Sequence, residues 1–216
     1  MAQIDIIYED NHLLVINKPV NIPMQEDNSK DEDLLNMCKT YLIRKYNKPG
    51  EAYLGLVHRL DRPVGGVCVF AKTSKAASRL SEQIRNHTFK KEYLAIVEDN
   101  GLKDNDRFED YLLKDEKRNM VKVDPKGKFA SLDYKVLKRQ NNLALVHINL
   151  HTGRSHQIRV QFSSRNHSLW GDQKYNKKAI VGQQIALWSY KIIFNHPTTK
   201  EKLEFTSSPK DFIIKP

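Results

Sequence analysis

Cysteine and long hydrophobic runs are scarce in this chain. Its 216 residues include two cysteines, Cys38 and Cys68, whose wide separation matches neither a disulfide framework nor a zinc-binding pattern. The longest aliphatic run, residues 13–16, is far shorter than the ~20 residues needed to span a bilayer. The first ten residues contain three carboxylates, where a secretion signal would be basic and then apolar. These features predict a cytoplasmic protein with no membrane segment and no metal site.

Linker-like sequence is equally rare. The chain has no Gly/Ser-rich stretch, no low-complexity segment and no internal repeat, so we expect residues 1–216 to form a single domain. Hydrophobic residues make up 39% of the chain and recur to its end, which is enough apolar material for a core. We expect this domain to be a monomer.

Acidic residues are outnumbered by basic ones. The chain has 36 Lys and Arg against 26 Asp and Glu, a net charge of +10. Such an excess favours a polyanionic partner, most often nucleic acid. The alternative is an ordinary basic protein with a well-solvated surface, and charge alone barely separates the two. The basic residues are scattered along the chain, so any basic face must be assembled by folding.

Strand patterns dominate the sequence. Short apolar or alternating segments predict strands at residues 6–8, 13–16, 67–71, 91–98 and 143–150, and a pair of strands in "IALWSYKIIF" and "KLEF" joined through residues 195–197. The very polar residues 102–142 are expected to form exposed strands and loops. Because helices are few and scattered among the strands, the predicted class is α+β.

Three helices are predicted from apolar spacing and capping residues. The acidic segment 31–33 suits the first turn of a helix that residues 47–50 end. Ser74 could cap a second helix, and Ser155 a third that runs from about residue 156 to residue 165.

Asp61 is the first candidate for chemistry, in the segment "GLVHRLDRPVGGVCVF". Aspartate is common in turns because it bonds nearby backbone amides, and on the local pattern alone a structural turn is favoured. Against that interpretation, Arg59 and Arg62 flank Asp61, and guanidinium groups favour the ionised form of a carboxylate. An ionised carboxylate is what a nucleophile or a general base needs.

The second candidate is the segment "HTGRSHQIR". Arg154 would lie at the start of the third predicted helix, where anions are favoured, and Ile158 would face the core. Arg159 would lie at the border of the buried stripe, where it could extend into a cleft. Both arginines are equally well explained as surface charges. His151 and His156 are not supported by any cysteine, and the turn between them argues against a metal site.

Tyr93, in "KEYLAIV", is the third candidate. A tyrosine in a strand is usually a core or cross-strand residue, and this is the favoured interpretation from composition. A tyrosine on the wall of a cleft can instead stack on a nucleobase, a known mode of RNA recognition. The spacing does not decide between them.

These segments together resemble the motifs of RluA-type pseudouridine synthases. The similarity is carried by "LLVINKPVNIPMQ", "HRLDRPVGGVCVFAKT", "KKEYLAIV", "HTGRSHQIRVQFSSRNHSLWGDQKY" and "LWSYKIIFNHPTTKEKLEF", and it runs in order from about residue 6 to residue 209. The pairing of H-R-L-D with G-R-S-H-Q-I-R is specific. It raises the catalytic hypothesis for Asp61 above the structural one.

The resemblance implies an enzyme that isomerises uridine in rRNA or tRNA to pseudouridine with no metal or organic cofactor. It implies that Asp61 is the essential aspartate, that Tyr93 stacks on the target uracil and that Arg159 pairs with the aspartate. Arg59 matches the residue that enters the RNA stack when the target base is flipped out. Ile158 would be an apolar pocket wall. His58, Arg62 and Arg154 are further expected to bind the substrate.

The fold implied is a mostly antiparallel sheet with flanking helices, bisected by an active-site cleft. Many relatives carry an S4-like RNA-binding domain before it; this chain begins with the catalytic motifs, so we expect that domain to be absent. The chain departs from the common pattern at residues 64–66, Val-Gly-Gly where many relatives have Thr-Ser-Gly, and at Gln161, where histidine is commoner. A non-catalytic RNA-binding protein on the same scaffold and a histidine-dependent ribonuclease are the alternatives.

Overall fold

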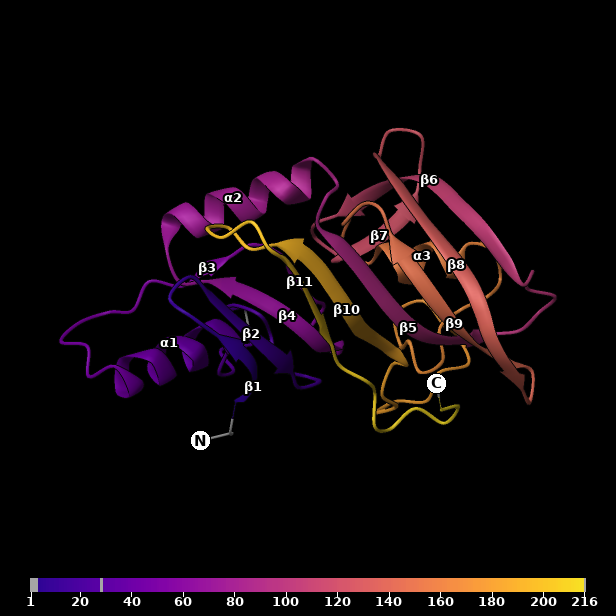
Figure 1. Ribbon diagram of the computed structural model, residues 1–216. Coiled ribbons are helices and arrows are strands. Elements are labelled where there is room, and N and C mark those ends of the chain that lie inside the picture. The colour runs from indigo at the N-terminus through magenta and orange to yellow at the C-terminus, as the bar shows by residue number, and fades with distance from the viewer. Residues whose placement is uncertain (1–3, 28, 216) are drawn as a thin grey trace. The chain divides into compact units, whose positions relative to one another are not determined.

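The computed structural model describes residues 4–27 and 29–215. These residues form two compact units, shown with their elements in Figure 1. The first unit contains the residues up to Lys90 together with Ser189–Ser208, and the second contains Lys91–Trp188 together with the segment from Pro209 on. Most strand pairings within the units are antiparallel, and helices accompany them, so the predicted α+β class is confirmed.

The first unit is built on four neighbouring strands. Their order is β1 (Asp5–Glu9), β2 (Leu13–Lys18), β4 (Gly65–Ala71) and the part of β10 (Leu187–Asn195) that starts at Ser189. The short β3 (Gly55–Leu56) pairs with β4, and β11 (Lys202–Thr206) pairs with β10. The helices of this unit are α1 (Leu34–Lys45) and α2 (Ser74–Arg85).

The glycine pair at the start of β4 allows a close approach of two strands. Gly66 has φ of +114°, and a Cβ built on it would lie 2.2 Å from the carbonyl oxygen of Ser189 in β10. Only a residue without a side chain fits both the conformation and the space. The "GG" of the sequence therefore brings β4 and β10 together directly after the segment that carries Asp61.

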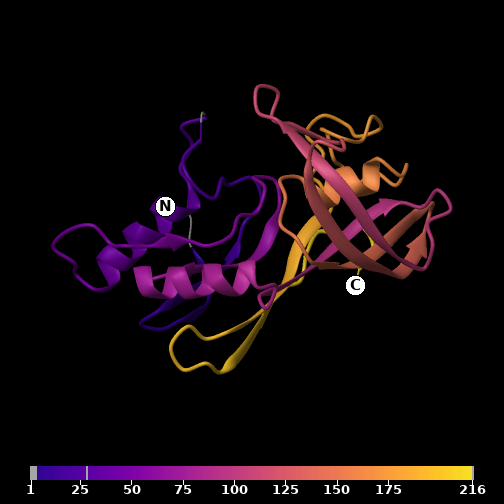
Figure 2. The same cartoon turned by 90° about the horizontal axis from the view of Figure 1, so that it is seen from above.

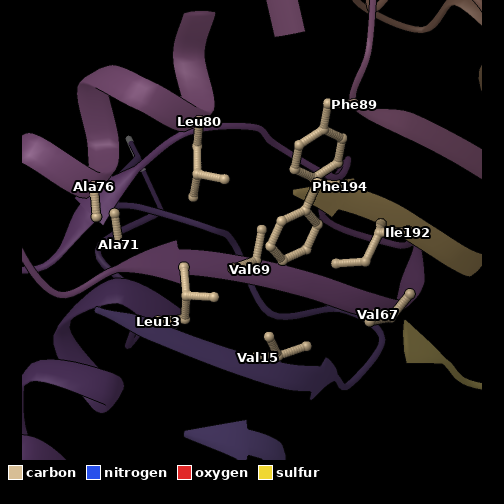
Figure 3. Packing of buried hydrophobic residues seen from close by; sticks show 10 residues of the cluster. All are labelled: Leu13, Val15, Val67, Val69, Ala71, Ala76, Leu80, Phe89, Ile192 and Phe194. Carbon is tan, nitrogen blue, oxygen red and sulfur yellow. The ribbon is translucent and has the colours of Figure 1, made fainter. Parts of the chain in front are cut away.

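The core of the first unit lies between its sheet and α2. Figure 3 shows Phe89 stacked on Phe194, with ring centroids 5.0 Å apart, above the side chains of β4, while Leu80 of α2 packs beside them. Each fully buried side chain of this size contributes about 1.5–3 kcal/mol to folding. The ten buried members of the cluster are Leu13, Val15, Val67, Val69, Ala71, Ala76, Leu80, Phe89, Ile192 and Phe194.

The second unit is a twisted antiparallel sheet with one helix on one of its faces. Its strand order is β5 (Lys90–Glu98), β9 (Leu143–Leu150), β8 (Lys128–Gln140), β6 (Asn105–Asp115) and β7 (Met120–Val123). The helix is α3 (Gln157–Ser163), and Figure 2 shows it, in orange, against these strands. Phe162 of α3 contacts the rings of Phe108 and Tyr134 at centroid distances of 5.0 and 5.3 Å.

The strand predictions are confirmed where alternation or an apolar run marked them. Residues 143–150 form β9 with the predicted bounds, and β10 and β11 form the predicted pair, which is antiparallel with Asn195 opposite Lys202. The polar residues 102–142 form β6, β7 and β8. Their alternation is visible in the burial of Phe108 and Leu112 against the exposure of their neighbours.

The helix starts differ from the predictions. Asp33 is the N-cap of α1, since its Oδ1 accepts the Asn36 N–H at 3.0 Å, so residues 31–33 precede the helix instead of forming its first turn. Thr73, not Ser74, caps α2 through a 3.1 Å bond from the Ala76 N–H. Each cap lies before the first helical residue because the capping residue keeps an extended backbone.

The third helix is shorter than predicted and Ser155 does not cap it. His156 precedes α3 in the left-handed conformation, with φ of 51°, and makes no side-chain capping bond. The buried Gln157 acts at this end instead: its Oε1 accepts the Arg154 N–H at 3.1 Å, and its Nε2 donates to the Ser131 carbonyl at 3.1 Å. The helix ends at Ser163, two residues before the predicted end.

Candidate active-site residues

Asp61 lies in the first unit, in the segment between β3 and β4. The Val64 N–H donates to the Asp61 carbonyl at 2.9 Å, which closes a tight turn over residues 61–64. Leu60 and Val64 are buried, with 6% and 2% of their surface exposed, whereas Asp61 is partly exposed. The apolar neighbours thus anchor the turn in the core, which explains why the sequence places a carboxylate between them.

A buried lysine binds backbone carbonyls of this turn. Lys18, at the end of β2, is 0% exposed, and its Nζ donates to the carbonyls of Pro19, Arg62 and Val64 at 3.0, 3.0 and 2.8 Å. The three acceptors use the three protons of an ammonium group. Burial lowers the pKa of Lys18 to about 8, while the nearby Asp61 carboxylate acts in the opposite direction. A positive charge therefore lies under the turn that presents Asp61.

The flanking residues of the turn have different surroundings. His58 accepts the Val69 N–H on its Nε2 at 3.1 Å, and its ring centroid lies 5.6 Å from that of Phe89. This contact attaches the segment to β4. Arg59, by contrast, is exposed. The prediction that both bind the substrate stays a prediction.

Arg62 is bound to the polar loop that precedes α1. Its guanidinium forms an ion pair with Asp31, lies 3.8 Å from Asp27 and donates to the Ser29 hydroxyl at 2.9 Å. About 40% of the Arg62 side chain is exposed, so this pairing is open to water. The same guanidinium that was expected to bind substrate thus ties the Asp61 turn to the loop.

Arg159 lies in the second unit, on α3, and is 5% exposed. It makes a two-pronged ion pair with Asp172: Nε lies 2.8 Å from Oδ2 and Nη2 lies 2.7 Å from Oδ1. Such paired geometry fixes both the position and the plane of a guanidinium. The Tyr175 ring lies below it, with its centroid 5.2 Å from the guanidinium carbon. The sequence pattern predicted Arg159 at the border of the buried face of the helix and did not indicate Asp172 or Tyr175.

Tyr175 is itself held in place. Its hydroxyl accepts the Val121 N–H at 2.9 Å and bonds Nδ1 of His156 at 2.7 Å. The His156 bond accounts for the unusual backbone before α3, because the left-handed conformation directs that ring to Tyr175. The "GDQKY" stretch in the same motif as "GRSHQIR" was the signal that could have located both Asp172 and Tyr175.

The remaining predicted residues of the second unit lie on β5, on α3 and in the loop before α3. Tyr93 is on β5 opposite Ile148 and is 6% exposed, and Ile158 on α3 is 5% exposed. Arg154 is exposed and donates from Nε to the carbonyl of Phe129 at 2.8 Å. Asp61 belongs to the first unit and these residues to the second, so the expected pairing of Asp61 with Arg159 stays a prediction, as does the cleft.

Comparison with known sequences decides the family. A family model described as RNA pseudouridylate synthase matches residues 12–164, which contain the Asp61 turn, β5 and α3. The chain belongs to the RNA pseudouridylate synthase family. It is accordingly an isomerase that acts on RNA, as the motif resemblance implied.

Individual relatives agree with this assignment. The chain is 33% identical to ribosomal large subunit pseudouridine synthase C of Buchnera aphidicola subsp. Baizongia pistaciae, over 97% of this chain and 68% of that protein. It is 33% identical to ribosomal large subunit pseudouridine synthase D of Zymomonas mobilis, over 96% of this chain and 70% of the relative. Among solved structures, human RNA pseudouridylate synthase domain containing 4 superposes with a TM-score of 0.80 at 22% identity, covering 95% of this chain and 89% of that one. This superposition supports the fold.

Two further observations concern membrane-spanning helices and metal-binding clusters. Within residues 4–27 and 29–215, no helix is long and apolar enough to cross a membrane. Among the same residues, no group of three or more His, Cys, Asp or Glu side chains is arranged to hold a metal ion.

Proposed function

We propose that this pseudouridine synthase isomerises specific uridines of structured RNA, with Asp61 as the essential carboxylate. The supporting observation is the Asp61 turn, which carries the family motif and is held by the fully buried Lys18. Ribosomal RNA is the favoured substrate because the relatives are named as ribosomal large subunit enzymes; transfer RNA is the second choice. We also propose that residues 1–216 act as one catalytic domain, as a cytoplasmic monomer.

The reaction is a rearrangement within one nucleoside. The bond between C1′ and N1 breaks, the uracil turns, and C5 bonds to C1′. C5 then loses its proton, and N1 gains one. Asp61 either attacks the nucleoside covalently or removes a proton from the ribose. Both routes need an ionised carboxylate, and the buried Lys18 ammonium binds the carbonyls of the turn that carries this carboxylate.

Access to the reacting carbon requires that the nucleotide leave its stack. Extrusion of a base from a structured RNA costs a few kcal/mol. Tyr93 would offset this cost by stacking on the uracil, and Arg59 by taking the place of the base. Ile158 would form an apolar wall, and Arg159, oriented by Asp172, would pair with Asp61. The net charge of +10, with Arg154 and Arg62 among the cations, would supply the contacts to phosphate.

The test is the variant Asp61→Asn, which keeps the size of the side chain and removes its charge. We expect product formation to be abolished, because a neutral amide is neither a nucleophile nor a base. RNA affinity should stay within about threefold, since phosphate contacts dominate binding. Product is measured by carbodiimide modification followed by reverse transcription, with binding measured by fluorescence anisotropy.

A matched control is Asp106→Asn, at a partly exposed aspartate of β6 outside the proposed site, which should retain turnover. Retained turnover in a clean preparation of Asp61→Asn would contradict the assignment. If the wild-type enzyme bound RNA without forming product, the non-catalytic alternative would be correct, and shortened RNA would indicate a nuclease.

A further inference from the structure

Two aromatic rings lie side by side on the surface of the second unit. Tyr111 on β6 is directly opposite Phe129 on β8, and the ring centroids are 5.9 Å apart at an angle of 66°. Tyr111 is 52% exposed and Phe129 is 43% exposed. Single exposed aromatic residues are common on protein surfaces, but an adjacent pair on one sheet face is a potential binding surface. We call this pair the aromatic platform.

The platform is on the face of the sheet that α3 does not cover. Leu112 and Ala130, the next residues along the same strands, are buried against Val160 of α3. Because successive side chains of a strand point to opposite faces, Tyr111 and Phe129 are directed away from that helix. The platform is therefore not part of the core that holds Arg159.

The backbone under the platform is fixed by a tight turn. The Asp124 N–H donates to the Tyr111 carbonyl at 2.9 Å, and the Gly127 N–H donates to the Asp124 carbonyl at 2.8 Å. A Cβ built on Gly127 would lie 2.3 Å from the carbonyl carbon of Leu112, so only glycine permits this approach. The two rings are therefore positioned before any ligand arrives, which reduces the entropy lost on binding.

Two cations lie beside the platform. Arg154 is exposed and is held to its edge by the 2.8 Å bond from Nε to the Phe129 carbonyl. Lys122 on β7 lies opposite Leu113, which shares a sheet face with Tyr111. Lys122 also pairs with Asp124 at 2.7 Å, but its side chain is 68% exposed, so this pair is weak and exchangeable. Residues 111–129 contain six Lys and Arg against three Asp and Glu.

We propose that the aromatic platform binds an unpaired nucleobase of the RNA substrate by stacking, with Arg154 and Lys122 on the adjoining phosphates. Aromatic rings beside cations are the usual design for binding single-stranded nucleic acid, because every base has a face that can stack. The surrounding positive charge favours a polyanion over a protein partner. This inference rests on the proposed function, since it assumes that the substrate is RNA.

The test separates stacking from packing within the sheet. The double variant Tyr111→Leu/Phe129→Leu keeps apolar volume and removes both rings, whereas Tyr111→Phe keeps the ring. The probe is a labelled single-stranded oligo(A) of about 12 nucleotides, a length within the range that such sites cover. Leu137→Ala, also exposed and on β8, is the control for loss of apolar surface.

We expect the double variant to bind the probe about 5- to 150-fold more weakly, the range that corresponds to the ~1–3 kcal/mol contributed by one stacked base. Tyr111→Phe and Leu137→Ala should bind it like the wild type. An RNA duplex of the same length should be affected less than twofold, since its bases are not available for stacking. Unchanged affinity of the double variant for oligo(A) would overturn the proposal, and a change in oligomeric state alone would assign the platform to a protein contact.

A second measurement does not depend on the variants folding. Wild-type protein is irradiated with a single-stranded RNA that contains 5-iodouridine, and the attached peptides are identified by mass spectrometry. Attachment at Tyr111 or Phe129 supports the platform, and attachment only elsewhere overturns it.

The outcome is separable from the proposed function. If the wild type forms pseudouridine while the double variant binds oligo(A) normally, the platform is wrong and the enzyme assignment stands. If no RNA yields pseudouridine but the platform variants lose oligo(A) binding, the platform stands and the proposed reaction is wrong. With both correct, the double variant should raise KM more than it lowers kcat.

Discussion

The two units bury a cation by opposite means. In the first unit, the Lys18 ammonium is bound to three backbone carbonyls, which carry no formal charge. In the second unit, the Arg159 guanidinium is paired with the Asp172 carboxylate, and both are almost fully buried. Lys18 holds the turn of Asp61, and Arg159 is itself a residue of the proposed chemistry.

The difference has electrostatic consequences. A cation that is bound only by carbonyls keeps its net charge, so desolvation lowers the pKa of Lys18 to about 8 while its field acts on Asp61. A cation paired with a carboxylate is neutralised locally, and what the pair gains is a fixed orientation. The first arrangement supplies charge to the site, and the second supplies geometry.

Breaking the pair in the second unit should have the largest effect on stability. Asp172→Ala leaves Arg159 buried without its carboxylate, and removal of one partner of such a pair costs about 3–5 kcal/mol. Urea unfolding followed by circular dichroism measures the loss. The control Asp106→Ala, at an exposed pair with Lys103, should unfold like the wild type. If Asp172→Ala were as stable as this control, the buried pair would not contribute to stability as expected.

In the first unit, the pH dependence of stability can be tested at Glu9, whose carboxylate and its four side-chain donors are called the carboxylate hub. Burial by itself raises the pKa of Glu9, but hydrogen bonds from two lysines and two tyrosines lower it to about 2. The donors are Lys45, Lys72, Tyr46 and Tyr41, at 2.7–2.8 Å. Because the folded pKa is below the unfolded value of 4.5, the hub stabilises the protein above pH 4.5 and loses this contribution between pH 4.5 and 2.

We expect Glu9→Gln to flatten the pH dependence of unfolding in that window. The contribution removed is at most about 3 kcal/mol, since each pKa unit corresponds to about 1.4 kcal/mol. Thermal melts of both proteins between pH 2 and 7 measure it. Parallel pH curves for Glu9→Gln and wild type would contradict the role of the hub.

Lys18→Met tests the carbonyl-bound cation, and here activity should change more than stability. The substitution removes the donors that hold the Asp61 turn, and a small misplacement of a catalytic group costs about 10- to 100-fold in kcat. Stability should fall less than in Asp172→Ala, because the cost of burying the Lys18 charge disappears with it. Steady-state kinetics and urea unfolding together measure both effects.

The pH profile separates a positioning role from a purely structural one. Wild-type kcat should fall as Lys18 loses its proton above about pH 8, and Lys18→Met should lack this limb. If kcat of Lys18→Met also fell above about pH 8, the fall would be due to the titration of another group.

The smallest effect is expected at the exposed pair between Asp31 and Arg62. Exposed ion pairs contribute little, so Asp31→Asn should leave the unfolding midpoint unchanged within error. RNA affinity should rise about twofold, because Arg62 no longer has this carboxylate as a competing partner for phosphate. Anisotropy titrations at two salt concentrations measure it, and weaker binding by Asp31→Asn would argue against a phosphate contact of Arg62.

Local patterns were enough to predict most strands of both units. β5 and β9 alternate apolar and polar residues or form short apolar runs, and such periodicity depends on the strand alone. The start of α1 and the cap of α2 were predicted one to three residues away from their observed positions, because Asp33 and Thr73 have suitable neighbours at the adjoining positions. Backbone conformation decides which of them serves as the cap.

The supports of the proposed site could not be predicted in the same way. Lys18 was not among the predicted site residues, since lysine is rarely buried and nothing local shows that three carbonyls will surround it. Arg159 and Asp172 are 13 positions apart and meet only because the segment after α3 turns back on the helix. The motif resemblance indicated Asp61, Tyr93 and Arg159, whereas their supports became visible only in the structure.

The order of the chain has a consequence for synthesis on the ribosome. The last strands of the first unit, with Ile192 and Phe194, follow the whole of residues 91–188. At a translation rate of about 5–20 residues per second, roughly 5–20 s pass between the synthesis of Phe89 and that of these partners. The second unit also awaits its final segment, which contains the buried Phe212 and Ile214. Neither unit can complete its core before these late residues are synthesised, so the nascent polypeptide exposes apolar surface in the interval.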